Sequence, residues 1–177
     1  MRRLIKSGAL VLLLAAILGT CALVADPHPS DDQIARELRD RRPLYEQLLK
    51  MVREEKRVTR INRDWIALAD RASVPNEEMP LHLPPARHAE YVRLFDALEL
   101  ESGVDRAADG SSVYFLRSSV GLSVSGSTKA LVWEPGFTGA ALATDDPGAL
   151  RDACTATGHC VTRRRIAPGW YVFYSGS

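Results

Sequence analysis

Three patterns of apolar and polar residues follow one another along the chain. Residues 8–25 include no charged side chain. Between Ile34 and Val52, apolar residues recur at close to helical spacing and charged residues fill the other face, which is typical of an amphipathic helix. Beyond Gly103 the apolar period shortens to two, as it does in strands. Helices followed by strands predict an α+β fold with a small antiparallel sheet.

Local signals place the ends of the predicted helices. Ser30 and Gln33 form an S-x-x-Q capping box, so a helix begins at this point. Pro43 has no amide hydrogen to donate, which predicts a kink or a restart of the helix just before it. The prolines at 84–85 suit the first turn of a second helix, whose apolar stripe extends to Gly103.

The segment between these helices has a weaker pattern. Residues 58–72 fit either a short helix capped at Asn62 or an irregular segment packed by Trp65, and the sequence does not decide between the two. Four prolines within residues 73–85 indicate a loop or an extended connection.

Turn residues separate the strands that we predict beyond Gly103. A turn at 109–110 leads into β-prone residues over 113–124, and a Gly and Ser turn at 125–127 leads into a strand over 130–133. These segments predict an antiparallel meander.

The end of the chain predicts an inserted short helix and a final hairpin. The helix covers 149–157, begins at the Asp-Pro sequence of 145–147 and ends at Gly158. Strands over 161–166 and 170–174 then pair around a Pro-Gly turn. The last strand is apolar on both faces, which predicts a central position in the sheet. The arginines of the strand before it favour an edge or an exposed face.

Residues 1–25 predict a membrane segment. At ~1.5 Å per residue, the 18 uncharged residues span about 27 Å, close to the roughly 30 Å of a hydrocarbon core. Arg2, Arg3 and Lys6 precede the segment, so we expect the N-terminus in the cytoplasm and the rest of the chain outside. The predicted organisation is a signal-anchor or signal peptide, a tether and one external domain, at residues 1–25, 26–29 and 30–177, with 30–102 mainly helical and 103–177 mainly antiparallel strands.

Three fates of the N-terminal segment stay open. We expect retention as a single-pass anchor in the cytoplasmic membrane, because Leu23 stands where a signal peptidase favours a small residue. Cleavage after Ala22 is the second fate and implies secretion. The third follows from Leu18 to Cys21, which resembles a bacterial lipobox and implies a lipoprotein modified at Cys21, although Thr20 departs from the small residue of that pattern. The export segment and this resemblance indicate a bacterial protein.

Composition narrows the classes of protein. Apolar residues make up 46% of the chain and charged residues 25%, as in ordinary globular proteins. The net charge is +1, and the predicted membrane segment with its flank takes three of the 23 basic residues and none of the 22 acidic ones, so the remainder carries −2. Because a nucleic-acid-binding domain needs a basic excess, we expect no nucleic acid as partner.

Cys154 and Cys160 are the cysteines of the predicted external domain. In an oxidising compartment they predict a disulfide, which would stabilise the fold by about 2 kcal/mol through loop closure. Together with His159 they also resemble zinc ligands, but two adjacent ligands without a fourth make a poor tetrahedral site. We therefore expect neither a metal nor a cofactor.

No catalytic motif is complete. Within residues 121–129, Ser127 stands where a phosphate-binding loop needs lysine, and Ser123 lacks the glycine that follows the serine of a nucleophile elbow. A strand, a turn and a strand explain this segment better. The histidines at positions 28, 82, 88 and 159 are read as solvated or packed side chains.

The sequence thus favours a membrane-anchored bacterial envelope protein that acts as a binding or interaction module, with the membrane contacted through residues 8–25 and an envelope protein as a partner. One rival is an exported hydrolase or transferase that uses Ser123 or Ser125 with a histidine at 82, 88 or 159 brought near by folding. Another rival is a subunit of an envelope complex, which predicts an exposed apolar patch.

Overall fold

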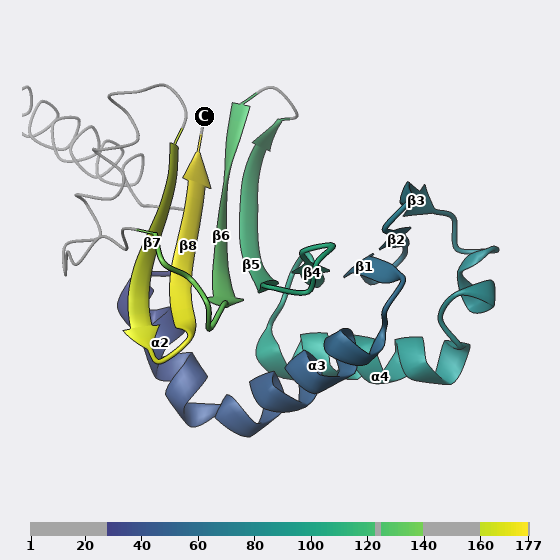
Figure 1. Ribbon diagram of the computed structural model, residues 1–177, viewed down its shortest axis with the longest axis horizontal. Helices are drawn as coiled ribbons and strands as arrows, with labels where there is room; N and C mark the ends of the chain where they lie inside the picture. Colours follow the sequence, from purple (N-terminus) through teal and green to yellow (C-terminus); the bar gives the residue numbers. More distant parts are fainter. Residues whose placement is uncertain (1–27, 123–124, 140–159, 177) are drawn as a thin grey trace, which may run out of the picture.

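The computed structural model describes residues 28–122, 125–139 and 160–176 (Figure 1). In these residues it contains three α-helices, a short 3₁₀ helix and eight strands. The helices are α2 (Asp31–Asp40), α3 (Arg42–Glu54), η1 (Met79–Leu81) and α4 (Pro85–Leu98), and the strands are β1 (Val58–Ile61), β2 (Ile66–Leu68), β3 (Arg71–Val74), β4 (Val104–Arg106), β5 (Val113–Leu122), β6 (Ser125–Trp133), β7 (Cys160–Ala167) and β8 (Trp170–Gly176).

The strands form one antiparallel sheet in the order β3-β2-β1-β4-β5-β6-β8-β7. The predicted α+β class is confirmed. The first half of the chain, however, contributes three strands as well as helices. Residues 58–61 and 66–68 are strands, so both predictions for this segment, a short helix and an irregular segment, are wrong. The strands are short and two of their pairings contain register shifts, which hides a period of two from the sequence.

The predicted helix starts near Ser30, Pro43 and the prolines at 84–85 are confirmed. The Ser30 hydroxyl accepts from the Gln33 amide, and the Gln33 side chain accepts from the Ser30 amide, so the capping box is complete. Helix α2 ends at Asp40 and α3 begins with Pro43 in its first turn. Helix α4 begins at Pro85 but ends at Leu98, earlier than predicted, because Glu99 takes a left-handed conformation with φ of 55°.

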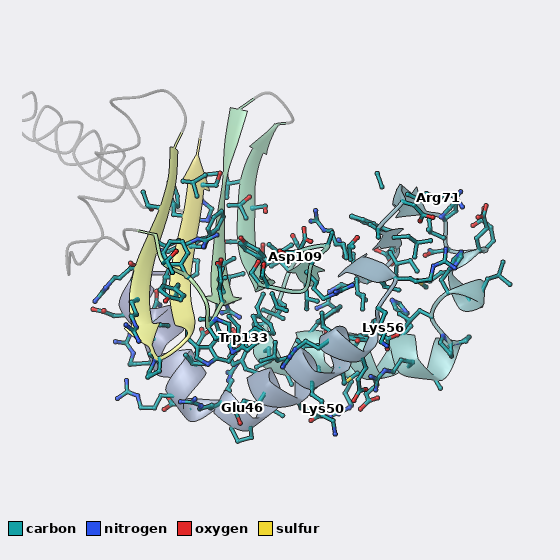
Figure 2. All side chains as sticks on the ribbon, viewed as in Figure 1. Glu46, Lys50, Lys56, Arg71, Asp109 and Trp133 are labelled. Carbon is teal, nitrogen blue, oxygen red and sulfur yellow. The ribbon has the colours of Figure 1, made fainter. Side chains whose placement is uncertain are left out.

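The main core lies between the helices and one face of the sheet, which we call the first face. A single row of residues crosses the sheet on this face through neighbouring strands: Ile61, Val104, Phe115, Leu131 and Val172. These residues and the apolar sides of all three helices form one buried cluster. On the outer side of α3, Glu46 and Lys50 project away from the sheet (Figure 2).

Gly103 connects α4 to the sheet at a position that only glycine fits. Its φ is 71°, and a Cβ atom there would lie 2.1 Å from the carbonyl oxygen of Ile61. That oxygen belongs to a backbone paired on both sides, since β1 lies between β2 and β4. The close approach lets the chain pass from the end of α4 into β4 beside β1.

The C-terminal hairpin is confirmed, and β8 is an internal strand between β6 and β7 as predicted. The predicted turn at 125–127 is wrong, because these residues begin β6 and pair with β5 and β8. The extended pairing of two long strands overrides the turn preference of Gly and Ser. The predicted helix at 149–157, the leader of residues 1–25 and residues 26–27 of the tether lie outside the described residues.

No helix among the described residues has the length and apolar character needed to cross a bilayer.

Candidate functional site

The sheet face opposite the helices, which we call the second face, carries a separate group of side chains. One row of this face is formed by Arg60, Asp105, Tyr114, Val132 and Tyr171, which pair in turn across five strands. The apolar cluster here consists of residues from strands and from the segment after β6, and it contains no residue of the described helices. Its members are Leu116, Ala130, Val132 and Tyr171, with Tyr114, Phe137 and Phe173 packed against them.

A groove of about 370 Å³ follows β5 along the second face. Its floor is apolar, with the rings of Tyr114 and Phe173 packed edge to face at 5.3 Å between centroids. One end is polar and charged, and the other end is rimmed by hydroxyl groups. The lining residues are Arg60, Asp105, Ala107, Tyr114, Leu116, Ser119, Thr128, Phe173 and Ser175.

The charged end of the groove is dominated by Arg60. Its guanidinium lies over the ring of Trp65 at 5.0 Å from the centroid. Among the described residues, Arg60 forms no ion pair and its Nε has no hydrogen-bond partner. Burial raises the pKa of Asp105, although the charge of Arg60 and the Arg106 amide act in the opposite direction. The burial of Asp105 thus favours its uncharged form, next to the positive charge of Arg60.

Arg163 of β7 holds the aromatic residues of the second face in place. Its guanidinium pairs with the Glu134 carboxylate, donates to the Tyr114 hydroxyl at 2.8 Å and lies over the Phe137 ring at 4.4 Å. It also lies 5.9 Å from the ring centroid of Phe173. This one side chain therefore contacts both aromatic residues of the groove. The prediction that the arginine strand is an edge is confirmed, since β7 ends the sheet.

A second polar group lies on the first face, beside the beginning of α2. The ring of His28 is buried, its Nδ1 lies 2.6 Å from the Ser118 Oγ, and its Nε2 lies 2.6 Å from the Ser127 Oγ. The ring of Tyr174 packs edge to face against it at 5.7 Å. In a neutral imidazole one nitrogen accepts and the other donates, so the two serines hold the ring in one tautomer at a time.

Buried charges adjoin this histidine. Asp31, in the first turn of α2, is 0% exposed, and its Oδ1 lies 2.6 Å from Nζ of Lys129. Arg164 approaches the other carboxylate oxygen at 3.6 Å and also pairs with the exposed Asp32. Neither oxygen of Asp31 has an aligned hydrogen-bond donor among the described residues, so charge attraction and the helix dipole hold it. The cluster fastens the start of α2 to β6 and β7.

A bulge in β5 brings Ser118 to this group. The register of β5 against β6 shifts between Leu116 and Ser118, so that Arg117 is an extra residue. The Arg117 guanidinium donates to the carbonyls of Leu98 and Glu99 and pairs with Glu37 at 2.8 Å. A cleft of about 330 Å³ opens beside these residues and is lined by Pro29, Arg63, Glu99, Leu100, Glu101, Arg117 and Ser118.

Among the residues singled out from the sequence whose side chains are described, His28 lies in the polar group of the first face, whereas His82 and His88 line neither the groove nor the cleft. His88 lies 3.1 Å from the carbonyl of Asn62, and His82 follows η1. Cys21, Ser123, Cys154 and His159 lie outside the described residues, and of Ser125 and Cys160 only the backbone is described. The predicted disulfide therefore stays a prediction. Within the described ranges, no three His, Cys, Asp or Glu side chains form a group suited to a metal ion.

Sequence reasoning missed both groups for different reasons. The groove is lined by residues of strands β1, β4, β5, β6 and β8, which come together through long-range pairing. The alternation of Tyr114 and Leu116 with buried neighbours was the signal available in the sequence. The sequence places His28 in the tether and does not indicate which residues contact its ring. Comparison of the chain with protein-family models, with curated proteins and with solved structures finds no match.

Proposed function

We propose that the protein is a binding module of the bacterial envelope whose groove on the second face takes a small organic anion with an apolar body. In this proposal residues 8–25 hold the domain at the cytoplasmic membrane, with the groove outside. The observation that carries it is the combination of Arg60, which has no ion-pair partner among the described residues, with an aromatic floor in a groove of about 370 Å³. Small-molecule sites combine an apolar lining with a few polar groups in this way.

The chemistry of the groove supports an amphipathic ligand. Tyr114 and Phe173 offer the faces and edges on which a ring or an alkyl chain packs. Arg60 offers fixed donors for a carboxylate, and its planar group suits two-oxygen acceptors. At the far end the hydroxyls of Ser119 and Thr128 lie 3.2 Å apart and can exchange hydrogen bonds with a polar tail. The support of both aromatic rings by Arg163 favours a preformed site.

A pair of model ligands tests the proposal. 3-Phenylpropionate has an aromatic ring and a carboxylate, and 3-phenylpropionamide has the same shape without the charge. Two-dimensional ¹H–¹⁵N spectra of the full-length protein are recorded during titration with each compound. We expect shifts that centre on β5, β8 and the residues around Arg60, and about tenfold tighter binding of the carboxylate, because a hydrogen bond to a charged group contributes about 1.5 to 3 kcal/mol.

Matched variants separate the charge from the apolar floor. Arg60→Gln keeps a polar side chain and removes the charge, so it should abolish the preference for the carboxylate over the amide. Phe173→Ala should weaken both compounds. Arg93→Gln, an exposed arginine on α4, should change neither. Equal binding of the two compounds to the wild type, or shifts confined to the helices, would refute the proposed ligand class.

The other binding alternative, a subunit of an envelope complex, has less support. It predicts one contiguous apolar patch. The exposed large apolar side chains of the described residues, Leu81, Val120 and Val161, come from η1, β5 and β7. Because β5 and β7 are separated by two strands and η1 lies beyond the opposite end of the sheet order, they do not form such a patch.

A further inference from the structure

We propose that Ser118 is a nucleophile activated by His28, and that the cleft beside it hydrolyses small uncharged esters. This activity is separate from the groove on the second face. The proposal rests on the placement of a buried serine and histidine at 2.6 Å in a cleft of about 330 Å³. The serine and the histidine differ from those that the sequence analysis considered for a hydrolase.

The imidazole is held in an arrangement suited to a general base. With the hydrogen on Nε2, His28 donates to the Ser127 Oγ, and its Nδ1 accepts the hydroxyl hydrogen of Ser118. Ser127 then fixes the tautomer, as the third group of a nucleophile, base and orienter arrangement does. The edge contact of Tyr174 keeps the ring from turning. Both distances lie within the range required for proton transfer.

The cleft selects Ser118 rather than Ser127 as the reacting group. Ser118 lines the cleft together with Pro29, the neighbour of His28, whereas Ser127 does not line it. The bulge at Arg117 is the reason that Ser118 faces this side of the sheet, and bulges often redirect a side chain at functional sites. Arg63 and Arg117 also line this cleft, with their guanidinium groups paired to Asp96 and Glu37.

The proposed step balances as ordinary acyl transfer. The Ser118 Oγ forms a bond to the ester carbonyl carbon while its proton passes to Nδ1 of His28. The bond from that carbon to the alkoxy oxygen breaks, and the departing oxygen takes the proton from Nδ1 and leaves as an alcohol. Water then attacks the acyl group on Ser118, gives one proton to Nδ1 and releases a carboxylic acid, after which the proton returns to Oγ. No metal, oxidant or reductant takes part.

The charges at the cleft indicate an uncharged substrate. The two arginines are matched by Glu99 and Glu101, so the lining has no excess of either sign. Arg63 is already paired with Asp96 at 2.7 Å, and Arg117 with Glu37 at 2.8 Å. Leu100 and Pro29 supply apolar surface. A short acyl ester fits this lining better than a phosphate or a dicarboxylate does.

The test uses the full-length protein with p-nitrophenyl acetate and with a fluorophosphonate, which bonds covalently to activated serines. We expect hydrolysis above the rate in buffer, and one fluorophosphonate per chain on the peptide that contains Ser118. Ser118→Ala should lose the label, and His28→Gln should slow labelling by about 100-fold or more, as expected when a general base is lost. Ser111→Ala, an exposed serine in a turn, serves as the matched control and should react as the wild type does.

Several results would overturn the assignment. They are an unlabelled wild-type protein, a label on Ser127 or another serine, and undiminished labelling of Ser118→Ala. Peptide mapping of the wild type needs no variant, so the test holds even where a substitution at the buried site prevents folding. The groove is tested by the 3-phenylpropionate titration and the cleft by fluorophosphonate labelling, so failure of one proposal is distinguishable from failure of the other.

Discussion

Replacing Asp31 by asparagine removes the only fully buried carboxylate among the described residues while keeping its shape. The aspartate lies 2.6 Å from Lys129, whose side chain is 6% exposed, and 3.6 Å from Arg164. After the change, Lys129 loses the carboxylate that it contacts, while Arg164 keeps its pair with the exposed Asp32. We therefore expect Asp31→Asn to lower the free energy of unfolding more than any single exposed ion pair would.

The loss in the free energy of unfolding depends on which buried charge each substitution leaves without the group that it contacts. Removal of one member of a buried pair costs about 3 to 5 kcal/mol. Asp31→Asn belongs near the upper end, because it takes the contacting carboxylate away from the buried Lys129 and also removes one of the carboxylates beside Arg164. Lys129→Met belongs near the lower end, because Asp31 keeps Arg164. The double variant should lose at least about 1 kcal/mol less than the sum of the two single losses, since contacting residues do not add.

Denaturant unfolding followed by tryptophan fluorescence measures these differences, because Trp170 is buried in the main core. Wild type, the two single variants and the double variant complete the cycle, and Arg42→Gln, which breaks an exposed ion pair on α3, is the control with a loss under about 1 kcal/mol. The reasoning is refuted if Asp31→Asn unfolds within about 1 kcal/mol of the wild type, or if Lys129→Met proves the more damaging change.

Four further predictions concern other parts of the molecule. Burial raises the pKa of Asp105 in the folded protein above its ordinary 3.8. Ionisation of Asp105 therefore destabilises the fold above the folded pKa, and this cost disappears as the pH falls below 3.8. Unfolding curves should show that Asp105→Asn is more stable than the wild type at pH 7 and not at pH 3. Gly103→Ala should lower the free energy of unfolding by more than about 2 kcal/mol or prevent folding, because its Cβ would lie 2.1 Å from a carbonyl oxygen. The control Gly136→Ala has open space around the added Cβ and should lose less than about 1 kcal/mol, as measured in thermal melts. Arg163→Ala should weaken 3-phenylpropionate binding through displaced aromatic rings, and equal affinity by spectral titration would contradict that role. Cys154 and Cys160 should resist alkylation until reduced, and reduction should lower stability by about 2 kcal/mol; free thiols in the native protein would exclude the disulfide.

The sequence predicted the elements that depend on neighbouring residues. The capping box of Ser30, the restart at Pro43, the helix begun by the paired prolines and the C-terminal hairpin each rest on contacts within a few positions, and all four are present. Such signals need no knowledge of distant pairing. The central position of β8 was also accessible, because a strand that is apolar on both faces is buried on both.

The sequence did not predict features that depend on distant partners. Strands β1 to β3 are short and contain register shifts, and β4, which pairs β1 with the rest of the sheet, comes more than 40 positions later. Ser125, Gly126 and Ser127 alone indicate a turn, but in the structure they are residues of β6 that pair with β5. His28 meets Ser118 across 90 positions, and Arg60 comes to line the same groove as Tyr114 and Phe173 only in the folded sheet. Both candidate sites are products of this long-range pairing.

The location of a bound amphipathic anion tests the central proposal most directly. We would record nuclear Overhauser effects between 3-phenylpropionate and the ¹³C-labelled full-length protein. The account predicts contacts from the ligand ring to the rings of Tyr114 and Phe173, with the carboxylate end nearest Arg60. Ligand contacts that reach only helical side chains or the cleft beside Ser118, with none to the two rings, would contradict it.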